Sequence, residues 1–246
     1  MNNDTPYVSV IIPAYNEQSR IADSLYEIKD YLSQQSYHSE IIVVDDGSND
    51  LTTEIVKFID IYGKEMNEHD EGVLMENIKN VGKGYSIARG MMRASGDIVL
   101  FTDADLSTPI SEFEKLITGF EEGYDVVIGS RSLKSSLVEK KPWYRGLMSR
   151  MFNLVVKLVS IRGIHDTQCG FKAYRREVAH RVAMLQRIYG FAFDVEHLYI
   201  AKKSGYKIKE VGVEWEHKDG STLSPLNSSL SMFRDLLLIR WFHRNL

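Results

Sequence analysis

Short apolar runs alternate with amphipathic helical segments along the first half of the chain, and this alternation is the strongest constraint on its fold. After the run Val8–Ala14, for example, Ile21, Leu25, Ile28 and Leu32 recur at helical spacing. Such a succession predicts βαβ units, and hence a doubly wound, mostly parallel sheet of the α/β class. Functional loops are expected at the carboxyl ends of its strands. The predicted strands are Val8–Ala14, Glu40–Val44, Val73–Asn77, Asp97–Thr102, Asp125–Gly129 and, near the end of the chain, Lys207–Trp215.

Length and composition limit the classes of protein to consider. The 246 residues, 43% hydrophobic and 26% charged, suffice for one large domain, and no Pro-rich or Gly/Ser-rich linker divides them. The net charge of −4 does not indicate binding to nucleic acid. The single cysteine, Cys169, excludes an internal disulfide and is typical of a reducing compartment. Without a signal-peptide pattern or an apolar run of ~18 residues, we expect a protein that is soluble or lies on a membrane surface.

One predicted strand leads directly into a pair of aspartates. The segment Ile98–Ser107 reads IVLFTDADLS, and its spacing lets the carboxylates of Asp103 and Asp105 turn toward one point where the strand ends. Mg²⁺ and Mn²⁺ prefer such oxygens together with those of a substrate phosphate. The segment therefore predicts a metal–diphosphate site, although Asp-x-Asp alone is also common in solvated turns.

Three other strand ends carry polar residues that suit a nucleotide. In the first, Tyr15 could stack on a base and Glu17 could accept a hydrogen bond from it. In the second, Asp45–Ser48 reads DDGS, and its carboxylates could accept hydrogen bonds from a ribose or a base. The third, Asn80–Gly84, reads NVGKG and places a lysine at a predicted helix start, which suits phosphate. Each motif alone is ordinary turn chemistry, but their recurrence at successive strand ends favours a nucleotide site.

Taken together, these motifs resemble a known family. PAYNE, DDGS, NVGKG, DADL and GSR, in this order and spacing, resemble family 2 of the inverting glycosyltransferases, which have the GT-A fold, over roughly residues 8 to 221. The segment Asp166–Lys172, DTQCGFK, is similar to the dolichyl- or polyprenyl-phosphate sugar transferases, particularly the dolichyl-phosphate β-glucosyltransferase-like members. The resemblance implies a single GT-A domain over residues 1–221, with a Rossmann-like nucleotide-binding half and an acceptor half, followed by a C-terminal amphipathic helix over 222–246.

The resemblance also implies roles for individual residues. Asp103 and Asp105 would hold Mg²⁺ or Mn²⁺, while Ser107 stands where mannosyl relatives can carry a glutamine as a further metal ligand. The residues expected to bind the donor are Pro13, Tyr15, Glu17, Asp46, Lys83, Asp103, Ala104 and Gln168. Those expected to contact the phosphate of the acceptor are Arg131, Arg145 and Lys172, and the catalytic set comprises Asp105, Arg131 and Asp194.

The chemistry of the acceptor decides whether a catalytic base is needed. A phosphate monoester, with a second pKa near ~6, is largely ionised at neutral pH and needs little base catalysis. Arginine suits such an acceptor because its planar fork contacts two phosphate oxygens together. A hydroxyl acceptor would need a base, for which Asp194 and Glu196 are candidates. Both carboxylates could equally be charges favoured at a helix N-terminus.

Two segments could contact a membrane. Trp143–Ser160 has a bulky apolar face and a basic face, a pattern typical of an interfacial helix but also of an ordinary core helix. The expected lipid acceptor favours the interfacial interpretation. Met232–Arg244 could be a second contact, a dimer helix or a core helix. We therefore expect a cytoplasmic protein, peripheral on the inner face of the cell membrane, and a homodimer is left open.

The preferred hypothesis is a metal-dependent, inverting transfer of a hexose to a polyprenyl or dolichyl phosphate, with glucose as the favoured sugar and UDP-glucose as the favoured donor. A transferase to a saccharide hydroxyl, with Asp194 as base, is the nearest alternative. From another class, a nucleotide-sugar binding protein without catalysis would bind UDP and show no turnover. The intact Asp103, Asp105 and Arg131 argue against it.

Overall fold

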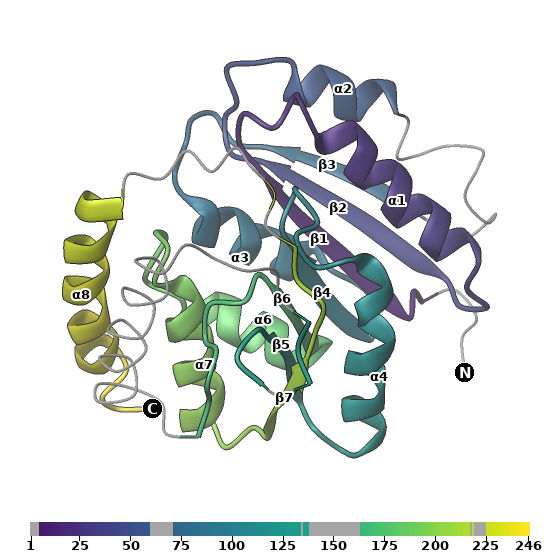
Figure 1. The fold of residues 1–246 in the computed structure, drawn as a ribbon. Helices are drawn as coiled ribbons and strands as arrows, with labels where there is room; N and C mark the ends of the chain where they lie inside the picture. Colours follow the sequence, from purple (N-terminus) through teal and green to yellow (C-terminus); the bar gives the residue numbers. More distant parts are fainter. Residues whose placement is uncertain (1–4, 60–70, 134, 138–162, 217, 219–224) are drawn as a thin grey trace.

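A seven-stranded sheet forms the centre of the computed structural model, which describes residues 5–59, 71–133, 135–137, 163–216, 218 and 225–246 (Figure 1). The strand order is β3-β2-β1-β4-β6-β5-β7, and β6 runs antiparallel to both of its neighbours while the other pairs are parallel. The prediction of a doubly wound, mostly parallel α/β sheet is confirmed. The strands are β1 Val8–Ala14, β2 Ser39–Asp45, β3 Glu71–Glu76, β4 Ile98–Thr102, β5 Val126–Ser130, β6 Phe171–Arg175 and β7 Ile208–Gly212.

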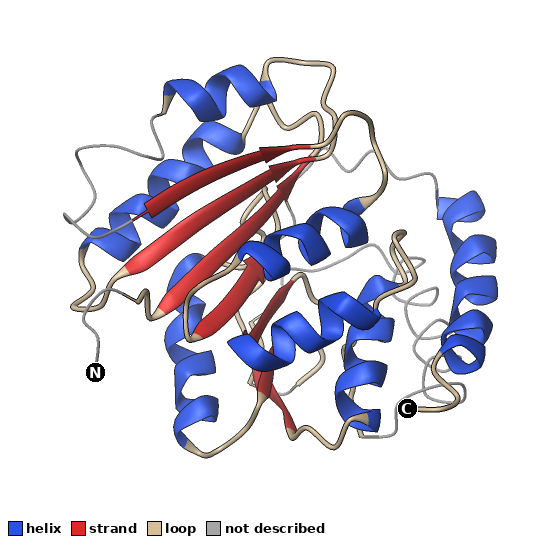
Figure 2. Cartoon of the chain, turned by 180° about the vertical axis from the view of Figure 1, so that it is seen from behind, coloured by secondary structure: helices blue, strands red, loops and turns tan. Residues whose placement is uncertain are grey.

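Helices cover both faces of the sheet because side chains alternate along each buried strand. In β1, Val8, Val10 and Ile12 join the core beneath α1, α2 and α4, whereas Ile11 joins the core beneath α3, α6 and α7. The latter three helices lie in front of the sheet in Figure 2, and α8 packs against α7 at the side. The helices are α1 Ile21–Ser33, α2 Thr52–Phe58, α3 Lys83–Arg93, η1 Ile110–Glu112, α4 Phe113–Glu121, α6 Arg176–Leu185, α7 Phe193–Lys203 and α8 Pro225–Phe242.

Backbone hydrogen bonds continue past the ends of the first three strands. The N–H of Asp46 donates to the carbonyl of Ala14 at 2.8 Å, and the N–H of Asn77 donates to the carbonyl of Asp45 at 2.8 Å. The first residues after β2 and β3 therefore remain hydrogen-bonded to the end of the neighbouring strand. This fixes the relative positions of three of the motifs that the sequence singled out.

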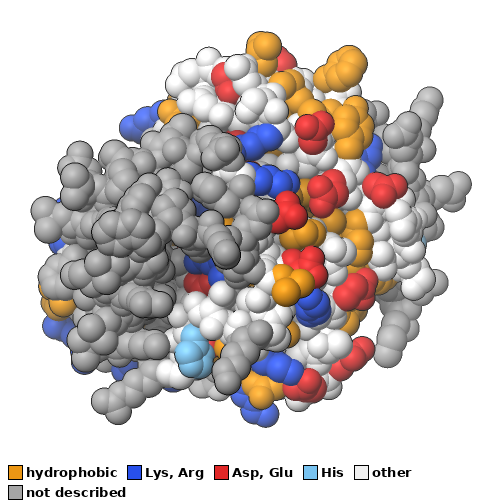
Figure 3. Space-filling model, viewed as in Figure 1, with side chains coloured by type: hydrophobic (Ala, Val, Ile, Leu, Met, Phe, Trp, Pro, Cys, Tyr) orange, Lys and Arg blue, Asp and Glu red, His pale blue; other side chains and the backbone are white. Residues whose placement is uncertain are grey.

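The surface charges and the helices can be compared with the expectation that the protein lies on a membrane surface. Acidic and basic side chains of the described residues are interspersed on the face shown in Figure 3, in line with the net charge of −4. Within the described part of the chain, no helix combines the length and apolar character needed to cross a bilayer. The predicted interfacial helix Trp143–Ser160 lies outside the described residues. The predicted C-terminal helix is present as α8.

Candidate active site

A cavity of about 300 Å³ lies where β1, β2 and β4 end. It is the position at which an open parallel sheet binds ligands. Most of the predicted donor and metal residues meet here, while Gln168, Arg131, Lys172 and Asp194 are not among the described residues that line it. The predicted residues in its wall are Pro13, Tyr15, Glu17, Asp46, Lys83, Asp103, Ala104 and Asp105.

The two aspartates after β4 each face a cation. Asp103 forms an ion pair with Lys83, and Oδ2 of Asp105 lies 4.0 Å from Nη1 of Arg20. Burial opposes the charge on Lys83, but the carboxylates of Asp103, Asp194 and Asp105 together more than offset this and raise the pKa of Lys83. Asp105 is also fixed by its own turn, because Oδ1 accepts a hydrogen bond from the N–H of Ser107 at 2.9 Å. Each aspartate of the Asp-x-Asp pair thus faces a cation within the cavity.

Gly170 makes room for the first of these carboxylates. A Cβ added to Gly170 would lie 2.1 Å from Oδ2 of Asp103, which is far inside a normal contact. The segment before β6 therefore lies directly against the aspartate that follows β4. A side chain at position 170 would fill the space that the carboxylate now occupies.

The carboxylates of Asp103 and Asp105 suit a divalent cation. Both are hard oxygen donors on one short loop that lines the cavity, and Gly170, which has no side chain, leaves room for the carboxylate of Asp103. No group of three or more His, Cys, Asp and Glu residues in the described ranges has the arrangement of a metal site. The pair therefore fits an ion that takes its remaining ligands from substrate phosphate and water, as Mg²⁺ commonly does.

Asp46 holds the glycine-rich loop in place. Its Oδ1 accepts hydrogen bonds from Nδ2 of Asn77 at 2.7 Å and from the N–H of Val81 at 3.0 Å, and its Oδ2 accepts one from the N–H of Gly82 at 2.8 Å. Gly82 has a φ of 123°, and a Cβ there would lie 2.4 Å from the carbonyl oxygen of Tyr189. This geometry sets Lys83 at the first residue of α3.

Arg20 is a cavity residue that the sequence motifs did not identify. Its guanidinium pairs with Glu17, with 3.0 Å between Nη2 and Oε1, and the hydrogen bond to Glu17 raises the pKa of Arg20. Glu17 therefore positions a cation in the cavity. The spacing of three residues between a carboxylate and an arginine at a helix start was the available signal.

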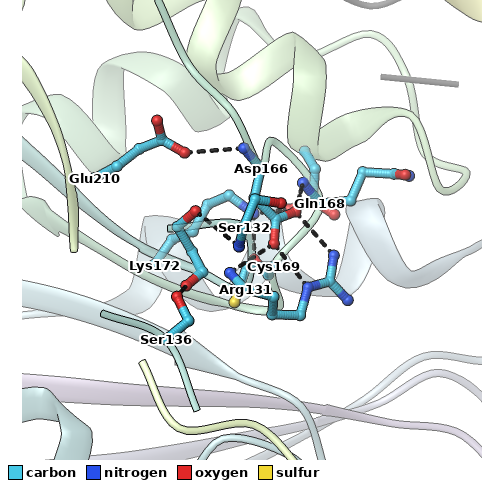
Figure 4. A network of polar contacts seen from close by, with 10 residues as sticks. Arg131, Ser132, Ser136, Asp166, Gln168, Cys169, Lys172 and Glu210 are labelled. Carbon is cyan, nitrogen blue, oxygen red and sulfur yellow. Dashed lines mark hydrogen bonds and ion pairs between the residues drawn. The ribbon is translucent and has the colours of Figure 1, made fainter. Parts of the chain in front are cut away.

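Arg131 is held by an aspartate from a distant part of the chain. Asp166 receives hydrogen bonds from Nε at 2.7 Å, from Nη2 at 2.8 Å and from the backbone N–H at 2.9 Å, as Figure 4 shows. The guanidinium carbon also lies 5.7 Å from the ring centroid of Trp215. Burial opposes ionisation of Asp166, but Arg131 more than offsets it and lowers the pKa of Asp166 to about 2.

The remaining predicted site residues, Gln168, Arg145, Lys172 and Asp194, are not among the described residues that line the cavity. Gln168 donates its backbone N–H to Oδ1 of Asp166 at 3.3 Å, and Arg145 lies outside the described residues. Nζ of Lys172, which is fully buried, donates to the carbonyl of Cys169 and to Oδ1 of Asp194, both at 2.5 Å. Burial raises the pKa of Asp194 despite this pairing. Asp194 is therefore a buried, ion-paired carboxylate.

Glu196, the second candidate base, has a structural role. Its Oε1 accepts hydrogen bonds from the N–H of Arg187 at 3.0 Å and from Nε2 of His243 at 2.7 Å, and its Oε2 accepts one from the N–H of Ile188 at 2.8 Å. These bonds fix the segment that leads to Gly190 and Phe191. Both of those residues line the cavity, and sequence reasoning did not single them out because nothing marks them as polar chemistry.

A mostly parallel sheet whose strand ends place an aromatic ring, paired aspartates and two cations around one cavity fits an α/β protein of the nucleotide-binding class. Comparisons with known proteins agree. The family model described as glycosyl transferase family 2 matches residues 9–183. The chain is 38% identical over 250 residues to a dolichyl-phosphate beta-glucosyltransferase of Dictyostelium discoideum, covering 97% of this chain and 75% of the relative.

Two further similarities extend this result. A dolichyl-phosphate beta-glucosyltransferase of Saccharomyces cerevisiae is 33% identical, with coverage of 95% and 74%. Among solved structures, glucosyl-3-phosphoglycerate synthase from Mycobacterium tuberculosis, in complex with Mn²⁺, UDP and glucosyl-3-phosphoglycerate, has a TM-score of 0.67 at 20% identity, covering 95% of this chain and 78% of that one. The chain belongs to glycosyl transferase family 2 and is a glycosyltransferase with the GT-A fold.

Proposed function

We propose that the chain transfers glucose from UDP-glucose to a dolichyl or polyprenyl phosphate, with inversion at the anomeric carbon. The observation that carries this proposal is the meeting of Asp103, Asp105, Lys83 and Tyr15 in one cavity. The relatives named dolichyl-phosphate beta-glucosyltransferase support the sugar and the acceptor. The mycobacterial glucosyl-3-phosphoglycerate synthase, which shares the fold, has also been solved in complex with Mn²⁺ and UDP-glucose, and this supports the choice of nucleotide.

Residues of the cavity bind the donor and stabilise its leaving group. Tyr15, 40% exposed, offers its ring to the base. Lys83 and Arg20 supply positive charge beside the diphosphate, whose negative charge grows as the bond to the sugar breaks. A divalent ion held by Asp103 and Asp105 would add Lewis-acid neutralisation of the same charge.

The buried environment of Asp194 favours a phosphate acceptor over a hydroxyl. The residue is only 6% exposed, its carboxylate is paired with Lys172, and it is not among the described residues that line the cavity, which disfavours it as a base for a hydroxyl. An ionised phosphate monoester needs no such base. Asp166 engages Nε and Nη2 of Arg131, which leaves Nη1 as the atom that would contact the acceptor phosphate.

Because the acceptor is lipid-linked, we place the reaction at a membrane surface. The test is transfer of radiolabelled sugar, from UDP-glucose or GDP-mannose, into an organic-extractable polyprenyl phosphate with and without Mn²⁺. We expect metal-dependent label in the organic phase from UDP-glucose alone, in a β-linkage. Label that enters only a water-soluble saccharide would overturn the lipid acceptor, and label from GDP-mannose alone would overturn the donor.

A further inference from the structure

The C-terminal half of α8 presents a basic and aromatic surface to solvent. Arg234, Leu237 and Trp241 follow one another at spacings of three and four residues, which places them on one side of α8, and Arg244 lies in the turn that follows the helix. Leu237 is 52% exposed, Trp241 is 60% exposed, and the side chain of Arg234 is 74% exposed. Arg240 is exposed beside them. We call these five residues the α8 outer face.

The opposite side of α8 is anchored, so the orientation of the outer face is fixed. Leu236 and Ile239 are fully buried in the core that α6 and α7 share. Nε2 of His243, itself buried, lies 2.7 Å from Oε1 of the buried Glu196 on α7. Among the described residues, these contacts hold the helix by the side that faces α7. The exposed apolar residues of the outer face take no part in those contacts.

The charge of the outer face is opposite to that of the molecule. The whole chain has a net charge of −4, yet the outer face carries three arginines and no acidic residue. Arg234 contacts the neighbouring Asp235 at 3.2 Å, and Arg244 lies 5.9 Å from the ring centroid of Trp241. Arginines that flank an exposed tryptophan and leucine are typical of helices at the boundary between headgroups and acyl chains.

We propose that the α8 outer face docks the protein on an anionic lipid bilayer. The aromatic and aliphatic side chains would enter the headgroup region, while the arginines would contact lipid phosphates. A second copy of the chain is a poorer occupant, because a two-fold contact through this face would bring arginine against arginine.

The location of α8 relates this surface to the cavity. A Cβ added to Gly190, a residue of the cavity wall, would lie 4.0 Å from Oδ2 of Asp235 on α8. In Figures 1 and 2, α8 also lies on the side of the molecule toward which the carboxyl ends of β1, β2 and β3 point. Docking through α8 would bring the cavity close to the headgroup layer. This consequence rests on the proposed function, whereas the docking itself does not.

The test is sedimentation with vesicles, in the absence of nucleotide and acceptor. Wild-type protein should bind vesicles of phosphatidylcholine with 30% phosphatidylserine, and binding should weaken as salt rises. The triple variant R234Q/R240Q/R244Q should bind roughly a hundredfold more weakly, since each arginine near an anionic surface contributes about fivefold. Leu237→Gln with Trp241→Gln should reduce binding to these vesicles while leaving the salt dependence in place.

Matched controls come from the surface elsewhere. Arg181→Gln with Lys203→Gln removes two exposed charges from α6 and α7, and Phe58→Gln removes an exposed aromatic ring from α2. These variants should bind vesicles like the wild type, and every variant should melt like the wild type. Wild-type protein that does not bind, or outer-face variants that bind normally, would overturn the proposal.

Two measurements separate this proposal from its alternatives. A wild-type dimer that becomes monomeric in the Leu237→Gln, Trp241→Gln variant, without vesicle binding, would assign the face to a second copy and overturn the proposal. Because no substrate is present, failed binding would leave the proposed glucosyl transfer untouched. Conversely, absent transfer with normal vesicle binding would overturn the proposed function alone.

Discussion

Replacing Gly170 with alanine tests the geometry of the paired aspartates without changing any charge. The new Cβ would lie 2.1 Å from Oδ2 and 2.4 Å from Cγ of Asp103, whereas carbon–oxygen contacts rest near ~3.3 Å. The carboxylate must therefore move by about 1 Å. A displacement of about 1 Å at a reacting centre costs on the order of 100-fold in rate. We expect kcat/KM for the donor to fall by about that factor, with a higher Mn²⁺ requirement.

The assay is glucosyl transfer at several Mn²⁺ concentrations, with thermal melting as the check on the fold. Gly190→Ala, in the wall of the same cavity, is the matched control, because the described atom nearest to its Cβ, apart from its chain neighbours, is Oδ2 of Asp235 at 4.0 Å. It should keep activity near that of the wild type. If Gly170→Ala acts through Asp103, adding it to Asp103→Ala should cause little further loss. Wild-type activity and metal dependence in a folded Gly170→Ala variant would refute the reasoning.

Four further predictions concern the cations and carboxylates of the site. Asp105→Ala should abolish turnover with an unchanged melting temperature, whereas retained activity would remove Asp105 from the metal site. Arg20→Gln should weaken UDP binding on the order of 10-fold by calorimetry, the loss of one charge-assisted contact. Arg131→Lys keeps the charge but not the fork, so the KM for the acceptor should rise more than the KM for the donor. The pKa of Asp166 is lowered from 3.8 to about 2, so its pair with Arg131 should contribute about 2 kcal/mol to the free energy of unfolding above about pH 4. This contribution should be lost as the pH falls toward about 2. Urea unfolding of the wild type and of Asp166→Asn between about pH 2 and about pH 5 measures this pH dependence, which should be weaker in the variant.

The convergence of Tyr15, Lys83 and the aspartates Asp103 and Asp105 was predictable from the sequence. Each follows an apolar run, and the carboxyl ends of parallel strands meet at one edge of a sheet. The position of each motif at the end of a predicted strand is therefore enough to predict that these residues lie close together. The same reasoning explains why the predicted strands agree with the observed ones to within a few residues.

Contacts between distant segments could not be read from the sequence in the same way. The antiparallel insertion of β6 between β4 and β5 brings Gly170 against Asp103, and no local pattern marks that reversal. The pair between Arg131 and Asp166 joins residues that are 35 positions apart. Asp194 lies at a helix start, where a carboxylate is common, and only its burial against a lysine distinguishes it.

The central claim is that Asp103 and Asp105 bind a nucleotide diphosphate through a divalent ion. The most direct measurement is Mn²⁺ binding by electron paramagnetic resonance, with and without UDP, in the wild type and in Asp105→Ala. We predict that UDP strengthens Mn²⁺ binding to the wild type and that Asp105→Ala removes this effect. Equal UDP affinity with and without Mn²⁺, or UDP-dependent Mn²⁺ binding that survives in Asp105→Ala, would contradict the claim.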